Sequence, residues 1–215
     1  MSDTILGFLK IGSQENITDL YENGTVYMNT LEYFRRVEDG ELRGDPNEGY
    51  SDVVDIKNGG TFRIEGIDQD FKFINARYGG YRKTGNLYCL YSISSRWFPN
   101  PLDFRLDERN LDFGTHALII KQPGVFIKKL EDELIKGGYN FKHGFVEYYE
   151  NKVRLMNLTP FDKSNKYEYQ KEFRFSVENE ENEPLKINIG SMKSYAEIIE
   201  AKELLGLELQ PKSNN

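Results

Sequence analysis

The sequence contains one cysteine, two histidines and no long apolar run, and each shortage excludes a class of protein. Cys89 cannot form an internal disulfide, so we expect a reducing, cytoplasmic location and a buried, unreactive thiol. Neither His116 nor His143 has another candidate ligand nearby in the sequence, so no zinc site is expected. No stretch approaches membrane-spanning length and no signal segment is recognisable, so no membrane association is expected.

Positive charge is also in deficit, because 28 Lys and Arg residues stand against 35 Asp and Glu, a net charge of -7. The summed field repels a phosphate backbone, so nucleic-acid binding is not expected outside a local basic groove. What the chain has in quantity is aromatic side chains, 14 Tyr and 14 Phe among 215 residues. Rings bury a large area each, so an aromatic-rich core is expected.

The order of the apolar segments predicts one α+β domain over residues 1–209, followed by a disordered tail at 210–215. Mixed, mostly antiparallel sheets with a few peripheral helices are expected. The predicted strands occupy residues 4–10, 25–28, 71–74, 86–94, 113–121, 171–177 and 185–189. The segment 86–94 carries the strongest strand pattern and is expected at the centre of a sheet.

Three segments predict helices, because apolar residues recur there at helical spacing after a capping signal. One begins after Ser13, one extends from Pro123 to the Gly137-Gly138 pair, and one begins after Ser194. Short apolar pieces between residues 51 and 76 are separated by glycine-containing turns, which favours antiparallel hairpins.

One strand near the C-terminus combines core residues with reactive side chains. In an extended segment Phe173 and Phe175 lie on one face, and Gln170, Glu172 and Arg174 lie on the other. One interpretation is a solvated strand face with an exposed Glu/Arg pair. The other is a Gln-x-Glu pair at a functional site.

Residues 38–50 have the turn-forming composition of an ordered loop and carry Arg43, Asp45 and Glu48. A surface loop held by local ion pairs is one interpretation, and a lid or substrate-contacting loop is the other. A weaker hypothesis is a nuclease or hydrolase in which Asp45 and Glu48 hold magnesium, although such sites draw ligands from several elements.

Three short pieces, in this order along the chain, resemble ADP-ribosyltransferase-like domains. The opening segment Leu9-Lys-Ile-Gly12, with the helix and Asn23-Gly24 that follow, is similar to the family's first strand and helix. Ser92-Ile-Ser94 resembles the Ser-x-Ser element, and Gln170-Lys-Glu172 resembles the Gln-x-Glu element. Lys10 stands where the family normally has Arg or His, and lysine supplies charge without the planar guanidinium.

This resemblance implies an ADP-ribosyltransferase-like fold and an NAD-dependent transferase or NAD glycohydrolase, in the setting of a toxin or anti-phage defence, with NAD as the substrate. It implies that Glu172 stabilises the oxocarbenium charge, Gln170 orients the acceptor and Ser92 supports the glutamate. The candidate NAD-binding residues are Lys10, Ser94, Arg43, Tyr169 and Arg174. No metal is expected.

A second resemblance joins Arg43-Gly-Asp45 and Glu48-Gly49, the strand Cys89–Ser92, and Lys166-x-x-Tyr169-x-x-Glu172-x-Arg174. These elements look like a family of uncharacterised bacterial and phage-associated proteins with an Asp-x-x-Glu loop and a terminal Glu-x-Arg strand. This resemblance implies no particular activity.

The alternative function is a non-catalytic, acidic binding module for a protein partner or a nucleotide-like ligand. The net charge of -7 and the many tyrosines in expected loops favour it, since tyrosine is an efficient contact residue. The two hypotheses differ in one structural requirement. The enzyme needs Lys10, Ser92 and Glu172 to meet at one cleft.

Overall fold

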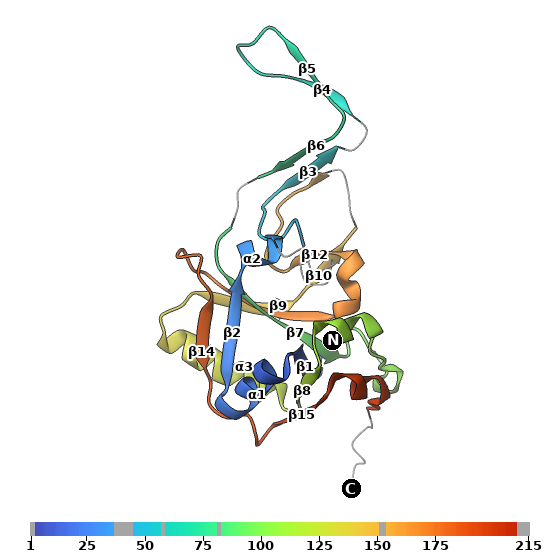
Figure 1. Cartoon of the computed structure of the whole chain (residues 1–215), viewed down its shortest axis with the longest axis vertical. Coiled ribbons are helices and arrows are strands. Elements are labelled where there is room, and N and C mark those ends of the chain that lie inside the picture. The colour runs from blue at the N-terminus through green and yellow to red at the C-terminus, as the bar shows by residue number, and fades with distance from the viewer. Residues whose placement is uncertain (1–2, 37–44, 57–58, 81–82, 151–153, 210–215) are drawn as a thin grey trace.

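Strand β7, Asn86–Ser94, lies at the centre of the fold, as its nearly continuous apolar sequence predicts. The structure is a computed structural model that describes residues 3–36, 45–56, 59–80, 83–150 and 154–209 (Figure 1). The tail predicted at 210–215 lies outside these residues. Over the described residues the chain is α+β with mostly antiparallel sheets, as predicted.

The main sheet has the strand order β14-β2-β7-β1-β8-β15, and β13 pairs with β7 and with β9. Its other strands are β1 Ile5–Gly12, β2 Thr25–Thr30, β8 His116–Ile120, β9 Phe141–Phe145, β13 Glu172–Val177, β14 Leu185–Asn188 and β15 Ala196–Glu200. The helices are α1 Gln14–Asn23, α2 Leu31–Arg36 and α3 Pro123–Lys136, with 3-10 helices η1 Pro101–Asp103, η2 Glu108–Phe113, η3 Asn165–Gln170 and η4 Ala201–Gly206.

Both faces of the sheet are buried, because side chains of β7 alternate between two apolar clusters. Tyr88 and Leu90 face the larger cluster, where α1 and α3 pack on the sheet. Tyr91 and Ile93 face the smaller cluster, which is covered by the segment containing η1 and η2 and, separately, by η4. The aromatic-rich core predicted from composition is confirmed by this arrangement, for example by the T-shaped contact of Phe8 with Phe126.

The helices predicted after Ser13 and from Pro123 are confirmed. Ser13 caps α1 by accepting a hydrogen bond from the Asn16 backbone N–H, and Gly24 ends the helix with φ 72°. Pro123 begins α3, which ends before Gly137 as expected.

The helix predicted after Ser194 is wrong. Residues 196–200 form strand β15, which pairs with β8 in the register Ile198 to Leu118. The apolar residues there fit a strand as well as a helix, and the free edge of β8 decides between the two. Helical structure begins only at Ala201, where Glu200 and Glu203 form a capping box for η4.

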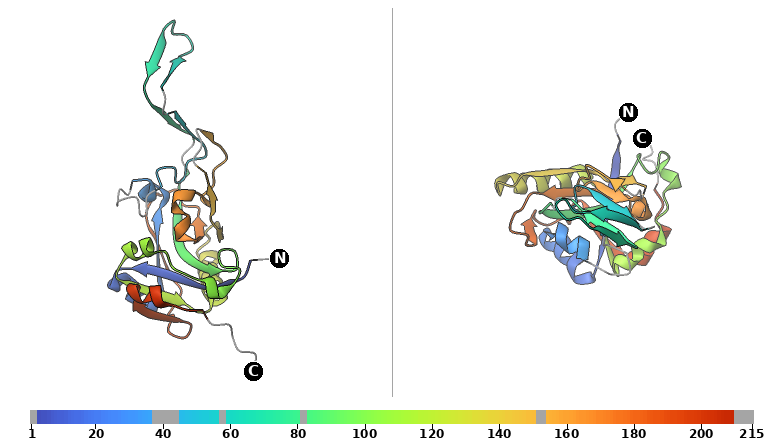
Figure 2. Two further views of the ribbon diagram at one scale, coloured as in Figure 1. Left: turned by 90° about the vertical axis from the view of Figure 1, so that its right-hand side faces the viewer. Right: turned by 90° about the horizontal axis from the view of Figure 1, so that it is seen from above.

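A long arm, described over residues 53–56 and 59–79, projects from the body (Figures 1 and 2). At its base β3, Val53–Ile56, pairs with β6, Ala76–Gly79, and with β11, Arg154–Leu155. At its tip β4, Gly60–Arg63, pairs with β5, Asp70–Phe73, in a two-stranded ribbon. Of the antiparallel hairpins predicted between 51 and 76, the one that joins β4 to β5 is confirmed, whereas β3 pairs with β6 and β11 instead of β4. Beside the base, β10 Glu147–Tyr149 and β12 Asp162–Ser164 pair in parallel.

The described part of the chain includes no helix that is both long and apolar enough to cross a bilayer.

Candidate functional site

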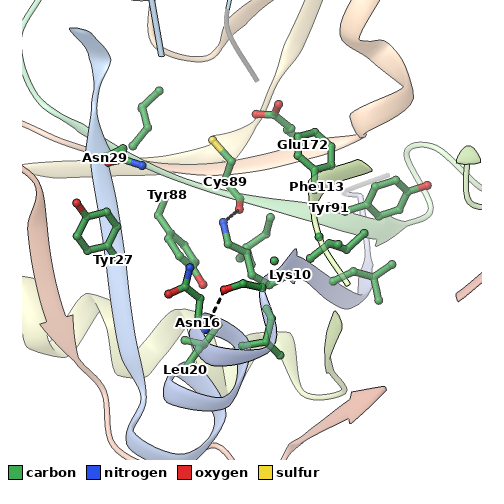
Figure 3. Close-up of a pocket in the computed structure, with 18 of the residues that line it drawn as sticks. Lys10, Asn16, Leu20, Tyr27, Asn29, Tyr88, Cys89, Tyr91, Phe113 and Glu172 are labelled. Atoms are coloured by element: carbon green, nitrogen blue, oxygen red, sulfur yellow. Dashed lines mark hydrogen bonds between the residues drawn. The ribbon is translucent and has the colours of Figure 1, made fainter. Parts of the chain in front are cut away.

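A cavity of about 780 Å³ opens where one edge of β7 is left without a strand partner (Figure 3). β2 pairs with this edge at Asn86 and Leu87, and β1 pairs with it from Tyr91 onward. In the described chain residues 88–90 therefore face the opening between β1 and β2. A volume of this size falls in the range of sites for small organic ligands.

The cavity concentrates positive charge in an acidic protein. Its lining includes four cationic side chains and two carboxylates, namely Lys10, Lys163, Arg174 and Lys186 with Asp19 and Glu172. Aromatic and amide side chains complete the wall, among them Tyr27, Tyr33, Tyr88, Asn16 and Asn29. Such a lining suits a ligand that combines an anionic group with a flat ring.

Lys10 extends from β1 into the gap beside β7. Its Nζ donates a 2.8 Å hydrogen bond to the Cys89 carbonyl oxygen, and it lies 4.4 Å from the Tyr88 ring centroid. The ammonium group thereby satisfies a backbone acceptor that a neighbouring strand would otherwise bond. Lys10 is a wall residue of the cavity, as the ADP-ribosyltransferase resemblance requires.

Glu172 belongs to a buried group of charges that we call the ionic cluster, consisting of Lys163, Glu172, Arg174 and Glu48. Lys163 Nζ donates to Glu172 Oε1 at 2.5 Å, and Arg174 Nε donates to Glu172 Oε2 at 2.6 Å. Arg174 also donates hydrogen bonds from Nη1 and Nη2 to the two carboxylate oxygens of Glu48, each at 3.0 Å. The interpretation as a solvated strand face is wrong, because Glu172 is 5% exposed and Arg174 is 1% exposed.

The ionic cluster keeps Glu172 negatively charged. Burial by itself raises the pKa of a carboxyl group, but the charges and hydrogen bonds of Arg174 and Lys163 outweigh it and lower the pKa of Glu172 from 4.5 to about 2. Glu48 shows the opposite balance, since burial raises its pKa against the opposing charge of Arg174. The site therefore presents an ionised, fixed carboxylate at neutral pH.

Cys89 lies between Lys10 and the ionic cluster. Lys10 and Glu172 reach the cavity from opposite sides of β7, and Cys89 is drawn between them in Figure 3. Burial raises the pKa of the Cys89 thiol to about 12, with Glu172 adding to the shift and Arg174, Lys163 and Lys10 opposing it. The thiol is thus protonated at neutral pH, which fits the unreactive role predicted for it, but Cys89 is half-buried rather than buried as predicted.

Gln170 lines the same cavity from the end of η3 rather than from the strand. Its Oε1 accepts a 2.6 Å hydrogen bond from Lys163, and its Nε2 donates to the Tyr169 hydroxyl at 3.1 Å. The Tyr169 ring stacks on the Arg109 guanidinium at 3.8 Å from its centroid. Tyr169 is not among the residues lining the cavity, and it contacts the lining through Gln170 and through Asn110, which donates to the Tyr169 carbonyl oxygen at 3.1 Å.

Ser92 supports the chain next to Glu172 and does not line the cavity. Its backbone N–H and its Oγ both donate to the Lys171 carbonyl, at 2.9 and 2.7 Å. Lys171 has φ 43°, a left-handed conformation that is unfavourable for a side chain other than glycine. Ser92 therefore fixes the turn that delivers Glu172. Ser94, buried at the far end of β7 opposite Ile5, lies outside the cavity lining.

The described part of the loop predicted at residues 38–50, which begins at Asp45, is bonded to the core. Glu48 reaches Arg174, and Asp45 accepts hydrogen bonds from the backbone N–H groups of Asn47 and Ser164. Both carboxylates are buried, and in this chain the bond from Arg174 to Glu48 joins the loop to strand β13. Arg43 lies outside the described residues.

The carboxylates of Asp45 and Glu48 are used in hydrogen bonds and an ion pair. In the part of the chain that the structure describes, no group of three or more His, Cys, Asp or Glu residues is placed to hold a metal ion. The magnesium hypothesis gains no support from this geometry.

Two residues of the site were not identified from the sequence. Lys163 contacts both Gln170 and Glu172, and the Tyr148 hydroxyl accepts a 2.9 Å hydrogen bond from the Glu172 backbone N–H. Lysine and tyrosine are frequent in this chain, and neither residue stands in a recognisable spacing to Glu172. Only the pairing of β10 with β12 brings both of them beside β13.

Comparison with known proteins finds no matching family model, no similar curated protein and no similar solved structure.

Proposed function

We propose that the cavity between β1 and β2 binds a phosphate-bearing nucleotide, with NAD as the ligand, and that Glu172 assists cleavage of its nicotinamide–ribose bond. The proposal rests on one observation, which is that several candidate site residues meet in a single cavity. Lys10 and Glu172 lie far apart in the sequence, on β1 and β13, and both line one cavity, where Gln170 lies close to Glu172. The ADP-ribosyltransferase resemblance requires Lys10 and Glu172 to meet in this way. It also requires Ser92 at the cleft, but Ser92 lies outside the cavity lining and bonds the turn before Glu172.

The charge and ring content of the cavity favour this ligand class. A dinucleotide carries a diphosphate and two flat bases. Lys163 and Arg174 are paired within the ionic cluster. Lys10 and Lys186 are therefore the lining cations outside it that can attract the diphosphate, although the chain as a whole carries a net charge of -7. Tyr27 on β2, which is 44% exposed, offers a ring on which a base can stack (Figure 3).

Cleavage of the nicotinamide–ribose bond requires a carboxylate that is already ionised when the ligand binds. When the bond to nicotinamide breaks, its electron pair leaves with the nicotinamide nitrogen, and positive charge develops on the ribose C1′ and ring oxygen. Glu172 carries the opposite charge at neutral pH because Arg174 and Lys163 hold its pKa at about 2. Water or an acceptor nucleophile then bonds to C1′, giving hydrolysis or transfer.

Measuring nicotinamide release tests the proposed cleavage of NAD. Purified protein incubated with NAD is expected to release nicotinamide, and Glu172→Gln is expected to abolish the release. Glu197→Gln is the matched control, because Glu197 is an exposed residue of β15 and its side chain is 53% exposed. No release by the wild-type protein, or equal rates in wild type and Glu172→Gln, contradicts the proposed reaction.

One observation favours a second candidate, a binding protein that does not turn over its ligand. Both carboxylate oxygens of Glu172 already accept hydrogen bonds from cations, Lys163 on one and Arg174 on the other. A ribose hydroxyl would have to share or displace one of these donors. In this candidate the ionic cluster holds the cavity wall in shape, and the ligand is retained intact.

A thermal-shift series separates the two candidates. Stabilisation by NAD or ADP-ribose, together with nicotinamide release, supports the enzyme. Stabilisation by nucleotides without any release supports the binding protein. If no nucleotide raises the melting temperature, both candidates fail.

A further inference from the structure

The ribbon at the tip of the arm is an open structure with two unpaired edges. Within the described residues β4 and β5 pair only with each other. A two-stranded ribbon is marginally stable alone, and its free edges are sites where another strand can add. No described side chain between residues 59 and 79 is buried.

The arm also exposes apolar side chains far from the core. Ile64, Ile67, Ile74 and Tyr78 are 45%, 45%, 84% and 67% exposed. They account for four of the twelve large apolar side chains that the described chain exposes. None of the four lies within β4 or β5, so a partner bound to the arm can cover part of this apolar area beside the ribbon.

Charge identifies where two copies of this acidic chain can approach. Residues 59–80 contain three cations and three carboxylates, Arg63, Lys72 and Arg77 with Glu65, Asp68 and Asp70, so the arm is electrically neutral. The whole chain carries -7, and two bodies repel each other. A second copy can therefore contact the arm without the charge repulsion that acts between the two bodies.

The sequence of β5 is complementary to itself. If two β5 strands pair in antiparallel fashion about Phe71, each Asp70 lies opposite Lys72 of the other copy, on the same face of the ribbon. The register of β4 with β5 adds Arg63 beside Asp70 and Thr61 beside Lys72. Opposite charges thus alternate across the joined ribbons. In β4 the equivalent pairing about residue 62 places Thr61 opposite Arg63, with no charge pair.

We propose that this protein forms a two-fold symmetric dimer in which the β5 strands of two copies pair about Phe71 and the two ribbons become one four-stranded antiparallel sheet. Antiparallel pairing of a strand with its own copy gives the same contacts on both sides, as a two-fold axis requires. The proposal does not depend on the function of the cavity.

The mass of the full-length protein across a dilution series tests the dimer. Light scattering coupled to size exclusion is expected to give twice the monomer mass at high concentration and the monomer mass on dilution. Lys72→Glu places two acidic groups opposite each other at both symmetric positions and is expected to weaken the dimer roughly tenfold. Lys136→Glu, the same charge change at an exposed site on α3, is expected to leave it unchanged.

A crosslinking experiment tests the register. Phe71→Cys places two thiols opposite each other at the two-fold axis, within the range of a disulfide, and is expected to give a covalent dimer under mild oxidation. Thr61→Cys, one strand away on β4, is the control and is expected to stay uncrosslinked. A monomer at every concentration overturns the proposal. So does a dimer that Lys72→Glu leaves intact, or one that crosslinks equally through residue 61.

Discussion

The ionic cluster around Glu172 and the Arg63–Asp70 pair on the arm join the same kinds of group at similar distances in opposite surroundings. Arg174 Nε lies 2.6 Å from Glu172, and Arg63 Nε lies 2.8 Å from Asp70. The side chains of the first pair are 1% and 7% exposed, and those of the second are 62% and 53% exposed.

Burial, rather than the distance between the charges, determines how much each ion pair contributes to stability. Water screens the pair on the arm, so that pair contributes little to stability. In the ionic cluster each charge depends on its partners, because an unpaired buried charge is costly. The same dependence holds the Glu172 carboxylate in one position and in one charge state, which a binding or catalytic site requires.

Arg174→Ala is expected to give the largest effect. It leaves Glu48 and Glu172 buried without their guanidinium partner, and we expect a loss of about 3–5 kcal/mol in the free energy of unfolding. Urea unfolding measures it. Arg63→Ala on the arm is the matched control, with an expected change of less than about 1 kcal/mol. Equal losses in the two variants would contradict the comparison.

Acid is expected to remove the stability that Glu172 contributes. Its pKa is lowered on folding, so this contribution is fully present above pH 4.5 and is lost as the pH falls toward 2. The shift from 4.5 to about 2 corresponds to about 3 kcal/mol. Unfolding free energies measured from pH 6 to pH 2 should therefore fall more steeply in wild type than in Glu172→Gln. Parallel curves would show that the ionic cluster does not hold this carboxylate.

Lys163→Met is expected to have an intermediate effect. It removes the ammonium that bonds Gln170 and Glu172 and keeps an apolar stem of similar length. We expect a loss of about 2 kcal/mol in the free energy of unfolding and a higher pKa for Glu172, because burial is then opposed by Arg174 alone among its hydrogen-bonded cations. Carboxyl NMR titration measures the pKa. Lys193→Met is the control, since that exposed lysine pairs with Glu22, and it should change neither quantity.

The smallest expected effect is the coupling of Arg63 with Asp70. A double-mutant cycle should give about 0.2–1 kcal/mol at low salt and close to zero in 1 M salt, because exposed charges are screened. The same cycle for Arg174 with Glu48 should keep its coupling in salt. At concentrations where the protein is monomeric, a salt-insensitive Arg63–Asp70 coupling would contradict the comparison.

Local sequence patterns correctly predicted those elements whose sequences are compatible with only one type of secondary structure. β7 matches the predicted residues 86–94 because its apolar run has no helical period, and α3 matches because Pro123 and Gly137 mark both ends. β15 was missed because residues 196–200 fit two structures and the free edge of β8 selected the strand.

The site was only partly predictable for a related reason. The spacing of Gln170 and Glu172 drew attention to the correct carboxylate. The partner of Arg174, however, is 126 residues away in the loop at Glu48, and a pairing at that separation leaves no local signal. Lys163 could not be identified for the same reason. Its contact with Glu172 depends on the pairing of β12 with β10, which brings Lys163 beside β13.

The most direct test of the central claim is a calorimetric titration of the wild-type protein with a carbocyclic analogue of NAD, which cannot lose nicotinamide. The account predicts saturable binding of one molecule per chain, weakened in Lys186→Ala at the cavity wall. Binding should be unchanged in Lys202→Ala, where the lysine pairs with Glu200 away from the cavity. Absence of saturable binding, or equal binding by both variants and the wild type, would contradict the account.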